Sequence, residues 1–467
     1  MPESRGLKSS SHEVHATAAR ERRDGMILIL MGALAFVILG IGWKSISAIE
    51  MGDFKVVYYG ARCLIQHGDP YSERDVLRVY HAEEHELPFD SQVDTQAITR
   101  FFYPPTAFVF TVPFAAMGLG VGKTLWLILS AGSLILAAIL TWDLAADFAP
   151  VLSGAILGYL LANSIWLFLI CNSAAIAVSF CVIATWCFVR ERYIAAGILC
   201  LAISLTLKPN DAGLVWLFFL LAGGTLRKRA LQTAAVVVVL SLPVVVWVTH
   251  AAPHWPQELK ANMASFTGVG GMADPAATGM AGRNMDCLVE LQSDVAIFFS
   301  SPGAFNLITY AVCAPLLLVW MFFSLRVKPG TSRFWLTLAT IAPLTMLPSY
   351  HLQHDARLMM LSIPGCAMLW ARRGWLGWSS MLITCAGVVI NGDMFSGARV
   401  LLTRPFVVPQ PNFMGRLTTV LLTRQAPLIL LGMAVFFLGV MAMHFLKRSR
   451  ISRSRPIPES ASRLPVT

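Results

Sequence analysis

Charged residues are scarce in this sequence. Asp, Glu, Lys and Arg make up 13% of the 467 residues, against roughly 25% in soluble globular domains. Hydrophobic residues make up 56%, and apolar runs recur from Met26 to Leu446 with no polar stretch long enough to fold independently. This scarcity excludes a soluble enzyme and predicts a single all-α, polytopic membrane domain.

Sequence motifs for nucleotides and metals are also lacking. There is no Walker A and no GxGxxG motif, and Gly268, Gly270 and Gly271 follow no expected strand, so we expect neither ATP hydrolysis nor dinucleotide binding. The nine cysteines form no CxxC pair and show no metal-ligand spacing, so we expect no metal or other cofactor. Most of them fit apolar packing, while Cys63 and Cys287 lie in polar loops where a disulfide between them is possible.

The apolar runs predict about twelve transmembrane helices in residues 26–446. They lie at 26–43, 121–142, 150–170, 174–189, 194–207, 211–225, 230–249, 304–325, 334–349, 358–371, 375–391 and 426–446. Several are shorter than the ~20 residues that a membrane crossing needs. The first run is too long for a cleaved signal sequence, so we expect residues 1–25 to form a basic, disordered tail before it and residues 447–467 to form a second basic tail.

Segment 104–118 is apolar but short, and the positions of the basic residues decide its status. If it does not cross the membrane, the clusters at 190–192, 227–229, 326–333 and 372–373 and both tails all fall on one side, as the positive-inside rule requires. We therefore expect an interfacial helix at 104–118 in an extracytoplasmic first loop, 48–120, and cytoplasmic termini. The net charge of +10 then reflects cytoplasmic loops beside membrane lipids, and no nucleic-acid partner is expected.

Asp53 is the first candidate for chemistry. It lies about ten residues past the first apolar run and precedes an amphipathic stretch, 54–64. A carboxylate at the membrane surface could act as a general base toward a membrane-bound substrate. It could equally be the N-cap of a helix that starts at Phe54.

Two further polar sites interrupt apolar runs on the predicted outer side. Lys208 could hold a lipid phosphate, or it could be a boundary lysine whose charge reaches the membrane surface. The run from Tyr350 to Arg357 contains His351, His354 and Asp355, which could shuttle protons or bind a metal, and Arg357 could bind phosphate with two parallel hydrogen bonds. A loop that only hydrates the membrane surface is the alternative.

Weaker candidates lie in the same predicted outer segments. Tyr103 precedes Pro104-Pro105 and must leave the α-helical region there. Tyr58 and Tyr59 could line a substrate site or belong to an aromatic belt at the membrane interface. Asn172 and Arg283 are weaker candidates, because polar residues at such positions are more often ordinary loop residues.

The order of these pieces resembles a known family. The run Gly52-Asp53-Phe54, then Tyr58-Tyr59-Gly60-Ala61 and Gly68-Asp69-Pro70-Tyr71, then Phe102-Tyr103-Pro104-Pro105 resembles the opening of glycosyltransferase family 87. That family belongs to the GT-C superfamily of integral-membrane transferases that use polyprenyl-phosphate sugars. The likeness continues through Leu207-Lys208-Pro209 and the hairpin at 350–357, over roughly residues 50–375, whereas Cys171-Asn172-Ser173 departs from the family's Gly-Gln-x-Asn-like element.

The resemblance implies a GT-C-like helical bundle in the inner (plasma) membrane. It implies transfer of a hexose, typically mannose, with inversion, from a lipid-linked sugar donor to an extracytoplasmic glycolipid or glycan acceptor. Asp53 would be the base. The substrate contacts that it implies are Tyr58, Tyr59, Tyr103, Asn172, Lys208, Arg283, Tyr350, His351, His354, Asp355 and Arg357.

Two other classes stay open. Twelve spans with both termini inside are common in secondary transporters, although the sequence shows no similarity between its two halves and its polar residues gather on one face. A flippase or ligase for lipid-linked sugars would share the substrate and use different loop chemistry. The sequence lacks the large late outer loop expected of a ligase.

Overall fold

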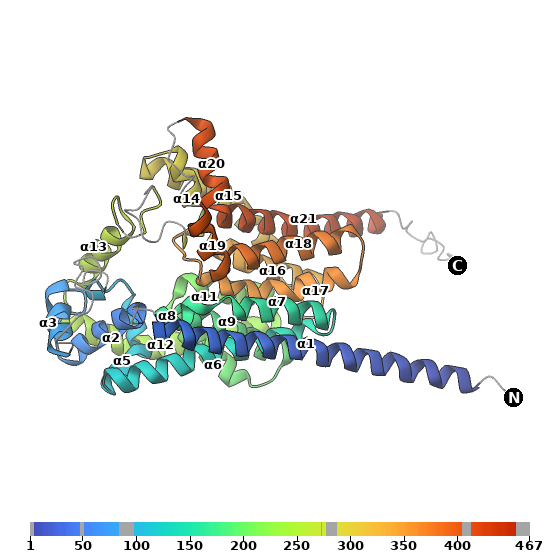
Figure 1. Cartoon of the computed structure of the whole chain (residues 1–467), viewed down its shortest axis with the longest axis horizontal. Coiled ribbons are helices and arrows are strands. Elements are labelled where there is room, and N and C mark those ends of the chain that lie inside the picture. The colour runs from blue at the N-terminus through green and yellow to red at the C-terminus, as the bar shows by residue number, and fades with distance from the viewer. Residues whose placement is uncertain are drawn as a thin grey trace, which may run out of the picture.

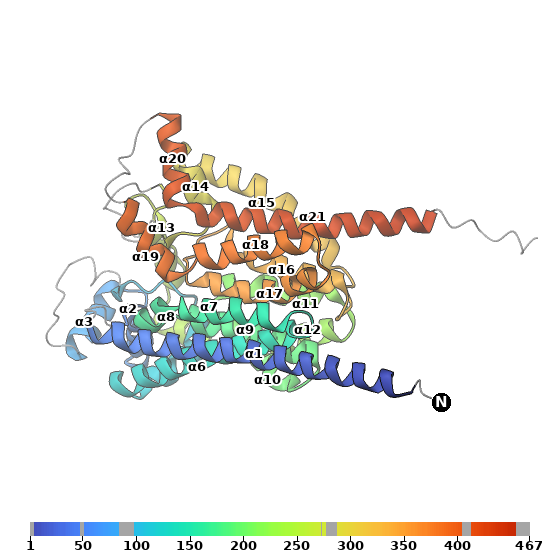
Figure 2. The ribbon, with the colours of Figure 1, turned by 45° about the vertical axis from the view of Figure 1, so that its right-hand side comes forward.

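A computed structural model describes residues 4–46, 51–83, 98–271, 273–276, 287–403 and 412–453. The chain is 82% helical, and in these residues the only β pairing is an isolated antiparallel bridge between Leu288 and Leu352. The all-α prediction is therefore confirmed. In both views the long helices run side by side as a bundle (Figures 1 and 2).

The helices of the N-terminal half are α1 (Ser4–Ile46), α2 (Gly52–Ile65), α3 (Glu73–Glu83), η1 (Pro105–Ala107), α5 (Phe108–Ala116), α6 (Leu119–Ala145), α7 (Pro150–Ala162), α8 (Ile165–Ile170), α9 (Ala174–Arg190), α10 (Ile194–Leu207) and α11 (Pro209–Ala222). Those of the C-terminal half are α12 (Gly224–Ala251), α13 (Trp255–Thr267), α14 (Leu291–Phe298), α15 (Pro302–Ser324), α16 (Ser332–Met346), η3 (Asp355–Ser362), α17 (Ile363–Ala371), α18 (Trp375–Ile390), α19 (Asp393–Thr403), α20 (Phe413–Thr423) and α21 (Gln425–Arg453). The N-terminal end of α1 and the C-terminal end of α21 lie at the same end of the bundle. The short helices α2, α3, α13 and α20 lie at the opposite end (Figure 1).

Five helices are long and apolar enough to cross a membrane, and they mark the chain as membrane-embedded. They are α1 (over Ala16–Lys44), α6, α12, α15 and α21 (over Gln425–Leu446), with a sixth if α18 and α19, bent by 66° at their break, form one span. Every apolar run of the sequence lies mainly on helix, but the run 150–170 is divided between α7 and α8. Twelve spans remain a prediction.

Helix α1 is fixed to the bundle by close contact with α7. A Cβ atom added to Gly154 would lie 2.3 Å from the carbonyl oxygen of Gly25, and one added to Gly158 would lie 2.4 Å from that of Leu28. The spacing of Gly154 and Gly158 is the small-xxx-small pattern that lets two membrane helices approach closely. Alanine at either position would force the two helices apart.

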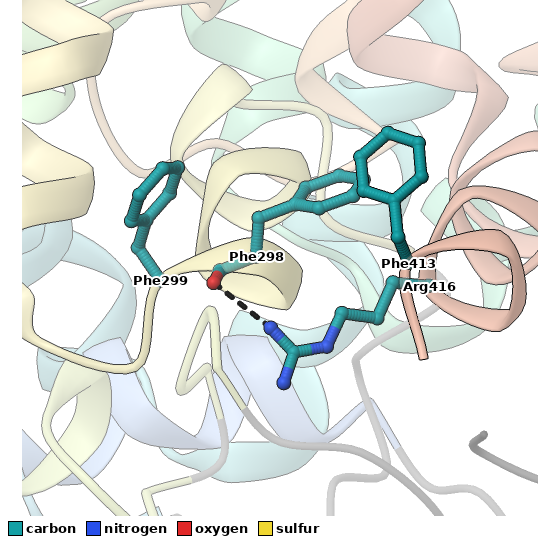
Figure 3. Close-up of a pocket in the computed structure, with 4 residues that line it drawn as sticks. All are labelled: Phe298, Phe299, Phe413 and Arg416. Carbon is teal, nitrogen blue, oxygen red and sulfur yellow. Dashed lines mark hydrogen bonds between the residues drawn. The ribbon is translucent and has the colours of Figure 1, made fainter. Parts of the chain in front are cut away.

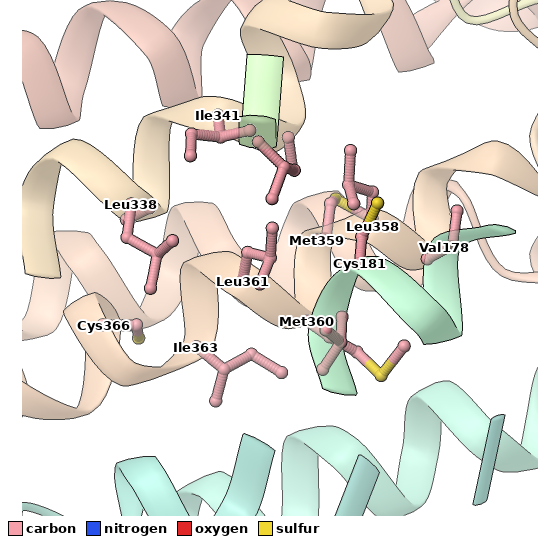
Figure 4. Packing of buried hydrophobic residues seen from close by; sticks show 14 of the residues in the cluster. Val178, Cys181, Leu338, Ile341, Leu358, Met359, Met360, Leu361, Ile363 and Cys366 are labelled. Carbon is pink, nitrogen blue, oxygen red and sulfur yellow. The ribbon is translucent and has the colours of Figure 1, made fainter. Parts of the chain in front are cut away.

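The core of the bundle surrounds η3, which begins at the candidate residue Asp355. Apolar side chains of η3 and α17 meet those of α9 and α16 there, among them Val178, Cys181, Leu338, Ile341, Leu358, Met359, Met360, Leu361, Ile363 and Cys366 (Figure 4). Because 3₁₀-helices longer than three or four residues are uncommon, the eight residues of η3 depend on this packing. The core thus holds the start of η3 in place.

A second apolar cluster lies under α2, α3 and α5. The predicted interfacial helix is seen as η1 and α5, and Pro105–Ala116 is among the helices too short for a candidate span. Its position at the membrane surface remains a prediction. Cys63 is buried in this cluster, and all nine cysteines are free, so the disulfide considered between Cys63 and Cys287 is absent.

Candidate active site

Asp53 lies in the first turn of α2 and is not its cap. The helix begins at Gly52, and its N-cap is Met51, which has left-handed backbone angles (φ 43°) and makes no side-chain capping bond. The N-cap interpretation of Asp53 is therefore wrong. A carboxylate in a first helical turn is stabilised by the helix dipole, and the side chain is left to make other contacts.

The carboxylate of Asp53 is held by Asn172. The Oδ1 atom of Asn172 accepts a hydrogen bond from the backbone N–H of Ala174 (2.7 Å) at the start of α9. Because this donor requires the amide oxygen, the amide nitrogen must face the other way, and it donates to Asp53 Oδ2 at 2.6 Å. Left-handed Cys171 (φ 52°) makes the turn, and its carbonyl accepts from the Trp126 indole (2.9 Å).

Lys208 points into the protein between α10 and α11. Its side chain is 12% exposed, and its Nζ lies 2.6 Å from Asp355 Oδ1 and 3.5 Å from Asp211 Oδ2. Burial lowers the pKa of Lys208, but the two carboxylates outweigh burial and hold it above its ordinary value. Lys208 is a charged, paired lysine, so the interpretation as a boundary lysine that reaches the surface is wrong.

Asp355 is the counterpart of Lys208 in the hairpin before η3. Its Oδ2 accepts from the backbone N–H of Leu352 (2.8 Å), so both of its oxygens are bonded. Burial raises the pKa of Asp355, but Lys208, His354 and His351 together outweigh burial, and the pKa lies well below the ordinary value. Asp355 is therefore ionised at neutral pH.

His351 completes the network on the far side of Lys208. Its Nδ1–H donates to the carbonyl of Ser349 (2.9 Å), and its Nε2 lies 3.2 Å from Asp211 Oδ1 and 3.2 Å from the Asn210 amide nitrogen. Burial lowers the pKa of His351, but Asp211, Asp355 and the hydrogen bond to Ser349 together outweigh burial and raise the pKa. Because the Ser349 carbonyl can only accept, Nδ1 carries a proton, while Nε2 faces Asp211 and Asn210.

The pKa of Asp53 is shifted by these same groups. Burial raises it, the Asn172 hydrogen bond and Lys208 lower it, and Asp355 raises it, with a net increase above 3.8. Asp53 thus feels the charges of the ion pair directly. We call Asp53, Asn172, Lys208, Asp211, His351 and Asp355 the Asp53–Lys208 cluster, built from α2, α9, the turn between α10 and α11, and the hairpin before η3.

Three other candidates border this cluster. The hydroxyl of Tyr103 accepts from Ser173 Oγ (2.9 Å), and burial raises its pKa to about 12. Burial raises the pKa of Tyr350, with further contributions from Asp355 and Asp53. Burial lowers the pKa of His354 to about 4, so this imidazole is neutral.

The remaining candidates lie elsewhere. Tyr58 and Tyr59 are buried among the aromatic rings under α2, where Tyr58 donates to Glu83 Oε2 (3.1 Å) and the Tyr59 ring lies 5.0 Å from that of Tyr80. Arg283 falls outside the described residues. All five N–H groups of Arg357 donate to interior acceptors, which are Ser164 Oγ, Asp393 Oδ1 and the backbone oxygens of Gln353, Asn163 and Asn391. We therefore leave Tyr58, Tyr59 and Arg357 out of the proposed substrate contacts.

Sequence reasoning missed Asp211 as a site residue. Asp211 is 1% exposed and contacts both Lys208 and His351. The signal available was its spacing, since a residue three positions after Lys208 can face it across one helical turn.

A cavity of about 580 Å³ lies apart from this cluster. It is lined by Phe298, Phe299, Phe413 and Arg416, where Arg416 Nη1 donates to the carbonyl of Phe298 at 3.0 Å (Figure 3). None of these residues belongs to the Asp53–Lys208 cluster.

No group of three or more His, Cys, Asp or Glu side chains suited to a metal ion occurs in the part of the chain that the structure describes. No family model, curated protein or solved structure matches this chain.

Proposed function

We propose that the chain is a membrane glycosyltransferase. It transfers a hexose, mannose by its resemblance to glycosyltransferase family 87, from a polyprenyl-phosphate donor to a glycolipid or glycan acceptor. The observation that carries the proposal is the Asp53 carboxylate, which is held by Asn172 at 2.6 Å and lies in the field of the Lys208–Asp355 ion pair. A general base needs this combination of fixed geometry and a pKa raised toward the working pH.

The reaction proceeds by inversion. The acceptor hydroxyl oxygen attacks the anomeric carbon, the bond from that carbon to the phosphate oxygen breaks, and the acceptor proton moves to Asp53. Asn172 occupies Oδ2, and no described side chain is hydrogen-bonded to Oδ1, which therefore takes the proton. The departing polyprenyl phosphate carries the bonding electrons as an anion and needs no strong acid.

Lys208 is the cation available to the donor phosphate. A lysine ammonium has three N–H donors, and two of them face Asp355 and Asp211. The third contacts the phosphate in this proposal. Asp211 and His351 keep Lys208 in place, so that its charge is presented at a fixed point.

The topology is part of the proposal. We place the Asp53–Lys208 cluster on the extracytoplasmic side of the plasma membrane and both termini in the cytoplasm, with about twelve spans. Support comes from the basic clusters, which share a side with the N-terminal tail. It also comes from the N-terminal end of α1 and the C-terminal end of α21, which lie at one end of the bundle (Figure 1).

A secondary transporter is the second candidate. The 66° bend between α18 and α19 and a buried network of ionisable groups are both features of transporters. A flippase or ligase for lipid-linked sugars would share the donor.

The test is transfer by purified protein. The protein is incubated with a panel of radiolabelled polyprenyl-phosphate hexoses and extracted membrane acceptors, and the label is followed into the acceptor fraction. Asp53→Asn protein prepared in parallel is the control. Transfer by the wild type alone supports the proposal, and absence of transfer with every donor, together with uptake of any sugar into vesicles, would contradict it.

A further inference from the structure

A second cavity, of about 410 Å³, lies between two turns at another part of the molecule. One turn joins α11 to α12, and the other joins α15 to α16. Its lining includes Gly223, Gly224, Arg227, Arg326, Lys328 and Pro329. Three of these six residues are cations, and no acidic residue lines the cavity.

The two turns are fastened to each other. The backbone N–H of Arg326 donates to the carbonyl of Leu221 (3.0 Å), and Arg227 Nε donates to that of Leu220 (2.9 Å). These bonds satisfy carbonyls that the end of α11 leaves unpaired. Gly223 (φ 82°) and Arg326 (φ 54°) both have left-handed backbone angles, which give the turns their shape.

The positive charges at this cavity are unbalanced. The side chains of Arg326 and Lys328 are exposed, and neither makes a side-chain hydrogen bond or ion pair with a residue that the structure describes. Arg227 uses only its Nε in the bond to Leu220. Three cations around one hollow repel each other, and a bound anion would remove that repulsion.

The cavity also lies where two candidate spans end. The span of α12 begins at Gly224, and that of α15 ends at Ser324. Apolar side chains are exposed along both helices, including Val239 and Leu242 on α12 and Leu318 on α15. An amphiphile with its anionic group in the cavity would therefore have its chains beside apolar protein surface.

We propose that this cavity binds the phosphate of an anionic phospholipid headgroup. The phosphodiester contacts Arg326, Lys328 and the free nitrogens of Arg227, and the acyl chains lie against α12 and α15. The cavity is separate from the Asp53–Lys208 cluster, because Lys208 and Gly223 flank opposite ends of α11, whose 14 residues span about 21 Å. The proposal does not depend on the proposed glycosyltransferase function.

Lipid binding to the purified full chain tests this proposal. Native mass spectrometry in neutral detergent compares dioleoyl phosphatidylglycerol with dioleoyl phosphatidylcholine, which has the same chains and no net charge. The variant combines Arg326→Asn with Lys328→Gln, because asparagine tolerates left-handed backbone angles. Arg373→Asn is the matched control, since Arg373 is also exposed and left-handed (φ 54°) but lies outside this cavity.

The wild type should prefer phosphatidylglycerol. Loss of each cation should weaken that binding about fivefold, and the double variant about 25-fold, while Arg373→Asn stays near the wild type. Single Lys328→Gln protein keeps the test valid if the double variant does not fold. Equal binding of the two lipids by the wild type, or unchanged binding by folded double variant, would overturn the proposal. If inorganic phosphate displaces phosphatidylglycerol from the cavity, the proposal is also overturned, because the ligand would then be free phosphate and not a lipid headgroup.

Discussion

Replacing Asp53 with asparagine separates catalysis from folding more cleanly than other changes in the chain. Asparagine has the shape of aspartate, and its amide oxygen can accept the hydrogen bond that Asn172 now donates to Oδ2 at 2.6 Å. Met51 is the N-cap of α2, so no capping bond is lost. The variant should fold as the wild type does.

The magnitude follows from the role of the carboxylate. Loss of a positioned general base reduces turnover by about 10²- to 10⁴-fold, which corresponds to about 2.7 to 5.4 kcal/mol in the activation free energy. The stability of the folded state should increase in this variant. The folded-state pKa of Asp53 is raised above 3.8 by burial, so its ionisation disfavours the folded state as pH rises above 3.8, and asparagine removes that effect.

The assay is initial-rate transfer from a radiolabelled polyprenyl-phosphate hexose, with melting temperature measured on the same preparation at pH 8. Glu73→Gln is the matched control. Glu73 is another acid at the same end of the bundle, and its ion pair with Arg100 (3.0 Å) is partly exposed, where such pairs contribute about 0 to 1 kcal/mol. Glu73→Gln should transfer at nearly the wild-type rate.

Two results would refute the reasoning. Folded Asp53→Asn protein that retains more than about a tenth of wild-type turnover lies outside the range for a general base, and Asp53 would then have no catalytic role. A melting temperature well below that of the wild type at pH 8 would show that the carboxylate is needed for structure, against the geometry at Met51 and Asn172.

Four further variants test the site, the topology and the interior. Asn172→Ala removes a bond that lowers the pKa of Asp53, so the acidic limb of the rate–pH profile should move to higher pH; an unmoved limb would separate Asn172 from the base. In intact cells, an impermeant thiol reagent should label Gln66→Cys protein and not Lys228→Cys protein, with the wild type as the background control; the reverse pattern would invert the proposed topology. Arg357→Met should destabilise the protein by about 3 to 5 kcal/mol, because it leaves a buried charge unpaired, and a wild-type melting temperature would disprove this structural role.

The helical content could be predicted from the sequence because it depends on local composition. A long apolar run in a membrane must satisfy its own backbone hydrogen bonds, and a helix does so within one segment. The runs near 121–142 and 230–249 accordingly lie within α6 and α12. The break inside 150–170 was not predicted, because Asn163 and Ser164 interrupt that run with only two polar residues.

The site was predicted in pieces that the sequence could not join. Lys208 and Asp355 were both candidates, but the bond between them joins residues 147 positions apart, and no local pattern encodes such a contact. Asn172 is a weak candidate in the sequence because such a residue is more often ordinary loop polarity. In the structure its amide is oriented by Ala174 toward Asp53, so a residue with little sequence signal makes the closest contact to the proposed base.

The two buried cations Arg357 and Lys208 differ in how many N–H donors they have free for a phosphate. Arginine suits phosphate, and Arg357 was a natural candidate, but its five donors are all used by interior acceptors, which include the carbonyls of Asn163 and Asn391 at the ends of α7 and α18. A phosphate could reach Arg357 only by displacing buried acceptors, which would cost more than the new bonds return. Lys208 has three donors and faces two carboxylates, so one donor is left. The count of unused donors, which requires the structure, therefore favours Lys208 as the phosphate contact that we propose.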